Sequence, residues 1–213
     1  MKINCFVFNR IFVNTYLLTS GNGEAAVIDP GCSREDEDRR LLGAIAGGGF
    51  RVRHILLTHA HADHIQGCET MKKAFPDAVL SAHPDCERDY NMANAYSSIF
   101  GFPEHNYPPF DNLLEHGGEI SFGSDSLQVL HTPGHAKGCV CLYSEKDGVL
   151  FSGDTLFRGS VGRTDLPGGS QQELLRSLKE KLAPLPDSTR VCCGHGEETT
   201  IAEERRYNPY FTF

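Results

Sequence analysis

The sequence predicts an α+β protein in which β-sheets are covered by helices. Short segments rich in β-branched and aromatic residues recur along the whole chain, and segments with helical apolar spacing lie between and after them. No internal repeat, low-complexity tract or linker divides the chain. Because one hydrophobic core can support 213 residues, we expect a single domain over residues 1–213.

In the first half of the chain, strands are expected at residues 3–8, 13–19, 25–28, 51–57 and 78–82, which are rich in strand-forming side chains. A helix is expected from Ser33, because acidic residues fill its first turn and Leu41, Leu42 and Ile45 share one side. Three glycines at 47–49 end this helix. A second helix is expected at 65–75, where Pro76 stops it. The strand at 51–57 ends in a continuously apolar run and is expected to be buried.

In the second half, a helix is expected near residues 85–100, followed by a long irregular segment that ends at Gly118. Such a segment is uncommon in a compact domain unless it shapes a binding site. Strands are expected at 120–122, 127–130, 139–143, 149–151 and 190–193. Residues 170–173 form a capping box, which predicts that a helix begins there and runs through Leu182. A last helix is expected at 197–206.

Composition and charge narrow the class of protein. The formal net charge is −8 and no Lys/Arg run is present, which argues against a nucleic-acid partner. No apolar run approaches the roughly 18 residues that a membrane helix requires, and the N-terminus does not resemble a secretory signal. We therefore expect a cytoplasmic protein without a membrane partner. Its eight cysteines are expected to be reduced thiols.

Four residues of the types that bind divalent metals fall within six positions, directly after the apolar strand at 51–57. They are His59, His61, Asp63 and His64. Divalent ions bind neutral imidazole and carboxylate groups that converge on one point. Alternate residues of an extended segment point the same way, so His59 and His61 can reach one ion; Asp63 and His64 suit a second. A solvated loop or packed core histidines would not explain so many donors in one short segment.

Three further residues of these types share one setting, because each follows an apolar strand and a glycine. They are His135 after Gly134, Asp154 after Gly153, and His195 after Gly194. A glycine lets the backbone approach a neighbouring group closely. With the first cluster they provide five histidines and two aspartates, enough for two ions that share a carboxylate. His83 and His131 lack this setting, and a supporting role beside the site is the most we expect of them.

The order of these motifs resembles the metallo-β-lactamase superfamily. The motifs are Thr-His-Ala-His-Ala-Asp-His at 58–64, Thr-Pro-Gly-His at 132–135, Ser-Gly-Asp-Thr-Leu-Phe at 152–157 and Gly-His-Gly at 194–196. The resemblance implies an αβ/βα sandwich of two mixed sheets flanked by helices, with the metals at one edge. It also implies that one ion is held by His59, His61 and His135, a second by Asp63, His64 and His195, and that Asp154 bridges them.

Within that superfamily, the run from Gly153 to Gly169 is similar to the glyoxalase II-like branch, the hydroxyacylglutathione hydrolases. β-Lactamases of this fold usually carry cysteine rather than aspartate at a metal position, so Asp154 favours the thioesterase-like branch. The resemblance implies a dinuclear metal-dependent hydrolase in which a metal-bridging hydroxide attacks a thioester carbonyl. Asp63 and Asp154 would be its catalytic carboxylates. The expected cofactors are two divalent ions, zinc first and iron or manganese as alternatives.

Two questions about the substrate stay open at this point. Longer glyoxalase II enzymes bind glutathione partly through a C-terminal helical region with basic residues. The sequence ends at Phe213 with only Arg205 and Arg206 after the last ligand, so glutathione is not the expected carrier by default and the thiol carrier of the small-molecule thioester stays open. An iron-dependent persulfide dioxygenase of the same fold is the alternative function; bound metal and oxygen uptake would distinguish it. The oligomeric state is also open.

Two residues are candidate substrate contacts, Arg163 and Tyr107. Arg163 follows the bridging aspartate on a glycine-rich loop, where an ion pair with Asp165 that fixes a turn is the favoured alternative. Tyr107 and Phe110 belong to the long irregular segment and are placed nearest the mouth of the site. Packing of this segment against the domain is the alternative for its aromatic residues.

Overall fold

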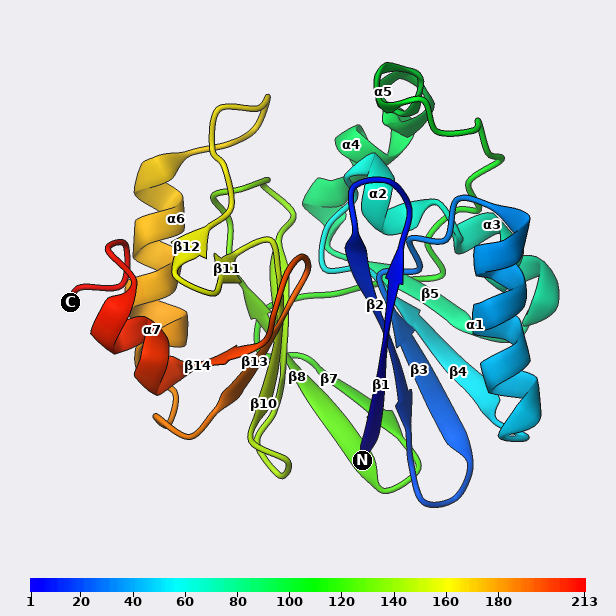
Figure 1. Cartoon of the computed structure of the whole chain (residues 1–213), viewed down its shortest axis with the longest axis horizontal. Helices are drawn as coiled ribbons and strands as arrows, with labels where there is room; N and C mark the ends of the chain where they lie inside the picture. The colour runs from blue at the N-terminus through cyan, green and yellow to red at the C-terminus, as the bar shows by residue number, and fades with distance from the viewer.

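The computed structural model describes residues 1–213, and its centre is a pair of six-stranded sheets that lie face to face (Figure 1). The first sheet contains, in spatial order, β1 (Lys2–Phe8), β2 (Val13–Thr19), β3 (Glu24–Ile28), β4 (Arg51–Leu56), β5 (Val79–Ala82) and β6 (Asn112–Leu113). Strands β1 to β3 pair antiparallel, and β3 to β6 pair parallel. This sheet is therefore mixed.

The second sheet is also mixed. Its strands, in spatial order, are β14 (Thr199–Thr200), β13 (Arg190–Cys193), β10 (Val149–Gly153), β9 (Val140–Ser144), β8 (Asp125–His131) and β7 (Glu119–Phe122). Only β10 and β13 pair parallel; the other neighbours are antiparallel. A short ribbon of β11 (Leu156–Phe157) and β12 (Ser160–Val161) follows β10.

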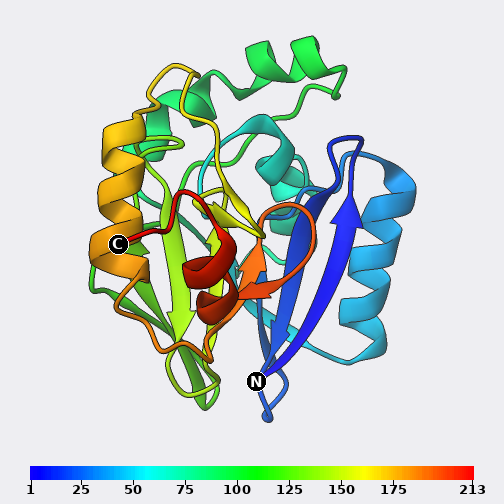
Figure 2. The ribbon, with the colours of Figure 1, turned by 60° about the vertical axis from the view of Figure 1, so that its left-hand side comes forward.

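Helices cover the outer face of each sheet. The first sheet is covered by α1 (Glu35–Gly47) and α3 (Cys68–Ala74), and the second by α6 (Gln171–Ser177), η2 (Leu178–Leu182) and α7 (Ile201–Tyr207). Figure 2 shows the same succession of layers from another side. The short helices α2 (Ala62–Ile65), η1 (Pro84–Cys86), α4 (Glu87–Asn91) and α5 (Ala93–Phe100) lie at one end of the sheets (Figure 1). The predicted sandwich of two mixed sheets flanked by helices is confirmed. None of the helices combines the length and apolarity that a membrane crossing demands.

The alternation of side chains along each strand builds the separate layers of the core. In β3, Ala26 and Ile28 pack between the two sheets, where Phe151 of β10 joins them. Ala25 and Val27 point to the opposite face and pack in the cluster that includes α1. Since successive strand residues face opposite sides, an uninterrupted apolar strand is what a sheet buried on both faces requires.

Several expected elements differ from the structure. The helix expected at 65–75 is two helices, α2 and α3, because the chain bends at Gly67. The Gly67 amide donates to the Pro30 carbonyl at 2.7 Å, and a Cβ on Gly67 would lie 2.3 Å from the Cys32 sulfur. The helix expected near 85–100 is likewise divided, into η1, α4 and α5. The last helix begins only at Ile201, since Thr199 and Thr200 pair with β13.

The cap of α6 provides a test of local helix stability. The Ser170 hydroxyl accepts a hydrogen bond from the Glu173 amide, as the capping box predicts. We expect Ser170→Ala to lower the free energy of unfolding by about 1 kcal/mol, because this amide loses its partner. Urea unfolding would measure the change. Ser188→Ala, at an exposed serine, is the control and should change stability by less than about 0.5 kcal/mol. Equal stability of the two variants would contradict a stabilising cap.

All eight cysteines are free, and every one except Cys5 is buried. Cys139 and Cys141 pack in the interior, where burial raises the pKa of the Cys141 thiol to about 11. A thiol with so high a pKa is protonated at neutral pH and is a weak nucleophile. These residues therefore act as small apolar side chains.

Candidate metal centre

The ligand-type residues converge at the end of the sandwich where β4, β8, β10 and β13 stop. His59 and His61 follow β4, His135 follows β8, Asp154 follows β10, and His195 follows β13. Asp63 and His64 lie on the single turn of α2. Loops at strand ends are a common place for chemistry, because the buried sheet holds their side chains at fixed positions. The donor atoms fall into overlapping groups whose members lie within 4.8 Å of one another.

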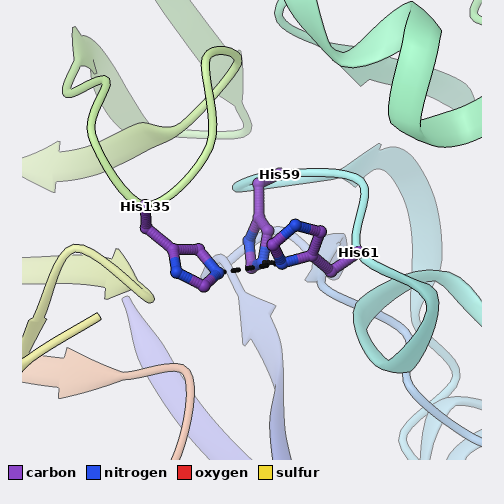
Figure 3. A group of neighbouring side chains, drawn as sticks. All are labelled: His59, His61 and His135. Atoms are coloured by element: carbon purple, nitrogen blue, oxygen red, sulfur yellow. Dashed lines mark hydrogen bonds between the residues drawn. The ribbon is translucent and has the colours of Figure 1, made fainter. Parts of the chain in front are cut away.

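The first group consists of His59, His61 and His135 (Figure 3). Nδ1 of His61 lies 3.1 Å from Nε2 of His59 and 2.8 Å from Nε2 of His135. In His59 and His135, the ring nitrogen that points away from His61 is Nδ1, and in both rings it already has a polar partner. Nδ1 of His135 donates to the Arg163 carbonyl at 2.7 Å, and Nδ1 of His59 lies 3.2 Å from the Thr58 hydroxyl. The Thr58 hydroxyl donates to Asp29, so it accepts from His59.

These bonds leave bare nitrogen lone pairs pointing at one place. With protons on the remote nitrogens of His59 and His135, their Nε2 atoms carry none. Both face the single Nδ1 of His61, which can donate to only one of them. Burial lowers the pKa of His61 to about 4 and that of His59 well below its usual range, so neutral imidazoles are favoured. Three imidazoles that converge in this way fit a divalent ion.

The second group consists of Asp63, His64 and His195. Oδ2 of Asp63 lies 3.1 Å from Nε2 of His195 and 3.5 Å from Nε2 of His64. Nδ1 of His195 donates to the Ile11 carbonyl at 3.1 Å, which leaves Nε2 facing the aspartate. This group therefore also offers two imidazole nitrogens and one carboxylate oxygen to a common point.

Asp154 lies between the two groups. Its Oδ1 is 3.3 Å from Nε2 of His64, and its Oδ2 is 3.6 Å from Nε2 of His135 and 3.7 Å from Nε2 of His195. Oδ1 of Asp154 and Nε2 of His64 are both fully buried, and the 3.3 Å contact between them lacks hydrogen-bond geometry, so neither has a hydrogen-bond partner. Buried polar atoms are rarely left without a partner, and a shared ion would supply one here.

Charge supports the same assignment. Burial opposes ionisation of Asp154, yet His64, His59 and His135 hold its pKa well below the usual range. Burial likewise opposes a charge on His64, but Asp63, Asp154 and Asp29 raise its pKa well above the usual value. The carboxylates of Asp63 and Asp154 therefore favour a positive charge at this point, which divalent ions would provide. The residues present fit two divalent ions.

Asp29 contacts the donor groups directly and was not singled out by the sequence analysis. It is buried after β3 with a positive φ of 48°. Its carboxylate accepts from Nδ1 of His64 at 2.9 Å, from the Thr58 amide at 2.8 Å and from the Thr58 hydroxyl at 2.6 Å. It therefore orients His64 directly and His59 through Thr58. The only signal in the sequence was an aspartate in the turn that ends a buried strand.

Gly194, which precedes His195, stands where a larger side chain would not fit. A Cβ on Gly194 would lie 2.3 Å from Oδ1 of Asp154 and 2.9 Å from the carbonyl carbon of Gly153. Real Cβ atoms do not approach other atoms so closely. The backbone of one ligand loop therefore rests against the carboxylate that another loop supplies.

The close approach of Gly194 to Asp154 predicts that a substitution at Gly194 disturbs the site, although Gly194 is not itself a metal donor. We expect Gly194→Ala to lower turnover about 100-fold, because the methyl group must displace Asp154. Metal content and turnover of the purified variant would measure it. Gly21→Ala is the matched control, because a Cβ there meets nothing within 4 Å. Wild-type turnover of Gly194→Ala would show that Asp154 does not depend on this contact.

The two candidate substrate contacts differ in position. Arg163 lines a cavity of about 630 Å³ that opens beside the donor groups, and its guanidinium makes two 2.7 Å hydrogen bonds to Asp165. Tyr107 is not among the residues that line this cavity. Its hydroxyl accepts from Gln66 at 3.0 Å, and its ring packs against Tyr90. The aromatic wall is formed instead by Tyr96 and Phe100 of α5 and by Phe157.

His83 and His131 do not support the donor groups. Their rings stack on each other with centroids 3.9 Å apart and planes inclined by 9°. Nε2 of His131 donates to the Lys137 carbonyl, and Nδ1 of His83 accepts from the Asp85 amide. No hydrogen bond joins either ring to a residue of the donor groups.

Histidines and aspartates gather in two groups at the strand ends of a sandwich of two mixed sheets. This combination of fold and donor groups is characteristic of metal-dependent hydrolases. The chain belongs to the metallo-β-lactamase superfamily, whose sequence profile matches residues 9–195. The hydroxyacylglutathione hydrolase GloC of Haemophilus influenzae is 32% identical, and the alignment covers 99% of this chain and 98% of GloC.

Solved structures show the same fold. The crystal structure of the B3 metallo-β-lactamase BLEG-1 superposes with a TM-score of 0.90 at 36% identity, over 100% of both chains. The crystal structure of TTHA1623 in a di-iron-bound form superposes with a TM-score of 0.87 at 39% identity, over 97% of this chain and 99% of that chain. The names of these relatives state a di-iron-bound form, a metallo-β-lactamase and a hydroxyacylglutathione hydrolase, so they differ in the metal or the substrate.

Proposed function

We propose that the protein hydrolyses thioesters in the manner of the hydroxyacylglutathione hydrolases. Its cofactors are two divalent ions, for which zinc is the preferred candidate and iron or manganese are the alternatives. The observation that carries this proposal is the position of Asp154 between two complete donor groups beside a cavity of about 630 Å³. A single ion would use one group and leave the other donors idle. The likeness to GloC supports a thioester as the substrate.

The reaction adds water across the acyl carbon–sulfur bond. A water oxygen forms a bond to the carbonyl carbon, the carbon–sulfur bond breaks, and the products are a carboxylic acid and a thiol. When bound, two divalent ions supply Lewis acidity and an activated water at neutral pH. Asp63 accepts a hydrogen bond from the attacking water and orients it. A thiol is acidic enough to leave as thiolate, so the chain needs no strong general acid.

The test is thiol release from S-lactoylglutathione, and from the lactoyl thioester of the neutral thiol N-acetylcysteamine, by protein of measured metal content. We expect release that depends on about two ions per chain, that a chelator abolishes and that added zinc restores. No release from either lactoyl thioester, or from a thioester of the neutral thiol with a longer acyl chain, by protein that holds two ions would overturn the proposal. A single bound iron with oxygen uptake on a persulfide would favour the dioxygenase alternative instead.

β-Lactam hydrolysis is the second candidate, because BLEG-1 covers the whole chain at a TM-score of 0.90. A chromogenic cephalosporin, assayed with the same preparation, separates the two activities. We expect kcat/KM for the thioesters to exceed that for the cephalosporin. The reverse order would make the thioesterase a side activity.

A further inference from the structure

The cavity beside the donor groups has mostly apolar walls. Ile11 comes from the β1–β2 loop, Ile99 and Phe100 from α5, Phe157 from β11, and Leu166 from the segment after β12. These segments are far apart in sequence, so the tertiary fold assembles the apolar surface. Ile99 is 73% exposed and Phe100 is 46% exposed. Apolar side chains left open to water around a cavity mark a surface that a ligand covers.

Few cationic side chains line this cavity. Arg163 is the one Arg or Lys side chain among its lining residues, and Asp165 already pairs with it in a two-bond contact. On the nearby β1–β2 loop, the Arg10 guanidinium lies against Gly101, 2.9 Å from where a Cβ would be. It thus lies at the carboxyl end of α5, where the helix dipole favours a cation.

One carboxylate faces the cavity without a partner in the chain. Asp89 of α4 lines the cavity, is only 7% exposed, and makes no hydrogen bond or ion pair. Its oxygens are not among the buried atoms that lack a partner, so they remain open to the solvent that fills the cavity. Asp89 can accept a hydrogen bond from a donor group of a ligand, and it repels a second carboxylate.

From these features we infer that the preferred substrate is a thioester with an extended apolar acyl chain on an uncharged thiol carrier, in preference to a small hydroxyacyl group on an anionic carrier such as glutathione. The inference rests on the proposed thioesterase function and narrows its substrate class. The apolar walls bind the chain. Asp89 discriminates against carboxylates of the carrier and accepts a hydrogen bond from a donor such as an amide N–H.

The first experiment varies the acyl chain on a neutral carrier. Acetyl and hexanoyl thioesters of N-acetylcysteamine are compared with the zinc-loaded enzyme. Burial of four more methylenes favours the longer chain, and we expect kcat/KM to rise at least about tenfold. Ile99→Ser/Phe100→Ser should lower this hexanoyl-to-acetyl ratio about tenfold. The control is Tyr207→Ser, which removes an aromatic residue that is 68% exposed on α7, and it should keep the wild-type ratio.

The second experiment varies the carrier at a fixed acyl group. We expect kcat/KM for the hexanoyl thioester of N-acetylcysteamine to be about tenfold higher than kcat/KM for the hexanoyl thioester of glutathione. Asp89→Asn should reduce this ratio at least about threefold. Thioester hydrolysis that is indifferent to chain length and carrier would overturn the inference and leave the proposed function standing. No hydrolysis of any of these thioesters by the two-metal enzyme would overturn the proposed function itself.

Discussion

Asp154→Ala is expected to lower kcat/KM about a thousandfold or more and to reduce the bound metal from two ions per chain to one or fewer. Asp154 is a carboxylate that faces both groups, with Oδ1 toward His64 and Oδ2 toward His135 and His195. Without it, the remaining donors no longer link two adjacent ions, and the cooperation on which the proposed hydrolysis depends is lost. A thousandfold loss corresponds to about 4 kcal/mol of transition-state stabilisation.

Metal analysis and thiol release, measured on the same preparation, test this expectation. Asp77→Ala is the matched control, because Asp77 is exposed and has no side-chain hydrogen bond or ion pair. It should retain both ions and full turnover. Full turnover of Asp154→Ala with both ions retained would disprove the bridging assignment. A folded variant is expected, because the side chain makes no hydrogen bond that holds the fold.

Asp29→Asn is expected to weaken binding at the second donor group about 10- to 100-fold while the fold persists. The carboxylate accepts a hydrogen bond from Nδ1 of His64 at 2.9 Å, which directs Nε2 toward the metal position. An asparagine amide in that place donates instead, so the favoured tautomer of His64 would carry its proton on Nε2. Asparagine also tolerates the positive φ of 48° at this position better than alanine does.

Titration of zinc into the metal-free variant, with a competing chelator, measures this loss, and excess zinc should restore part of the turnover. Asp125→Asn serves as the control, because Asp125 is also a buried aspartate with a charged partner, Lys146 at 2.7 Å. It should lower stability and leave zinc affinity unchanged. Wild-type affinity of Asp29→Asn at both positions would show that Asp29 does not set the His64 tautomer.

The strands were the most predictable part of the fold. Segment 13–19 is β2, and the expected 190–193 is β13, because short runs rich in β-branched, aromatic and apolar residues favour strands. Helix boundaries were less predictable. The break at Gly67 depends on the Pro30 carbonyl and the Cys32 side chain, which lie more than thirty positions earlier in the chain. A local pattern carries no information about such a contact.

The residues of the candidate site also differ in how well the sequence alone predicted them. The cluster from His59 to His64 was visible because four donors occur in six positions, and the three late donors were visible through their strand–glycine setting. Asp29 was not visible, because its importance comes from two contacts across the fold, with Thr58 and His64. The cavity wall was also misplaced: Tyr107 turns toward Gln66, whereas Tyr96 and Phe100 line the cavity.

The sequence by itself determined the kind of chemistry this protein can perform, because the donors are residue types that bind divalent metals, and their spacing and order are local properties of the chain. Only the tertiary structure decided how those donors are oriented and what they face. The Asp29 contact to His64, the space that Gly194 leaves for Asp154, and the unpartnered Asp89 all join segments far apart in sequence. Such contacts form only when the two sheets pack, since burial then fixes side chains that the local sequence leaves free to rotate.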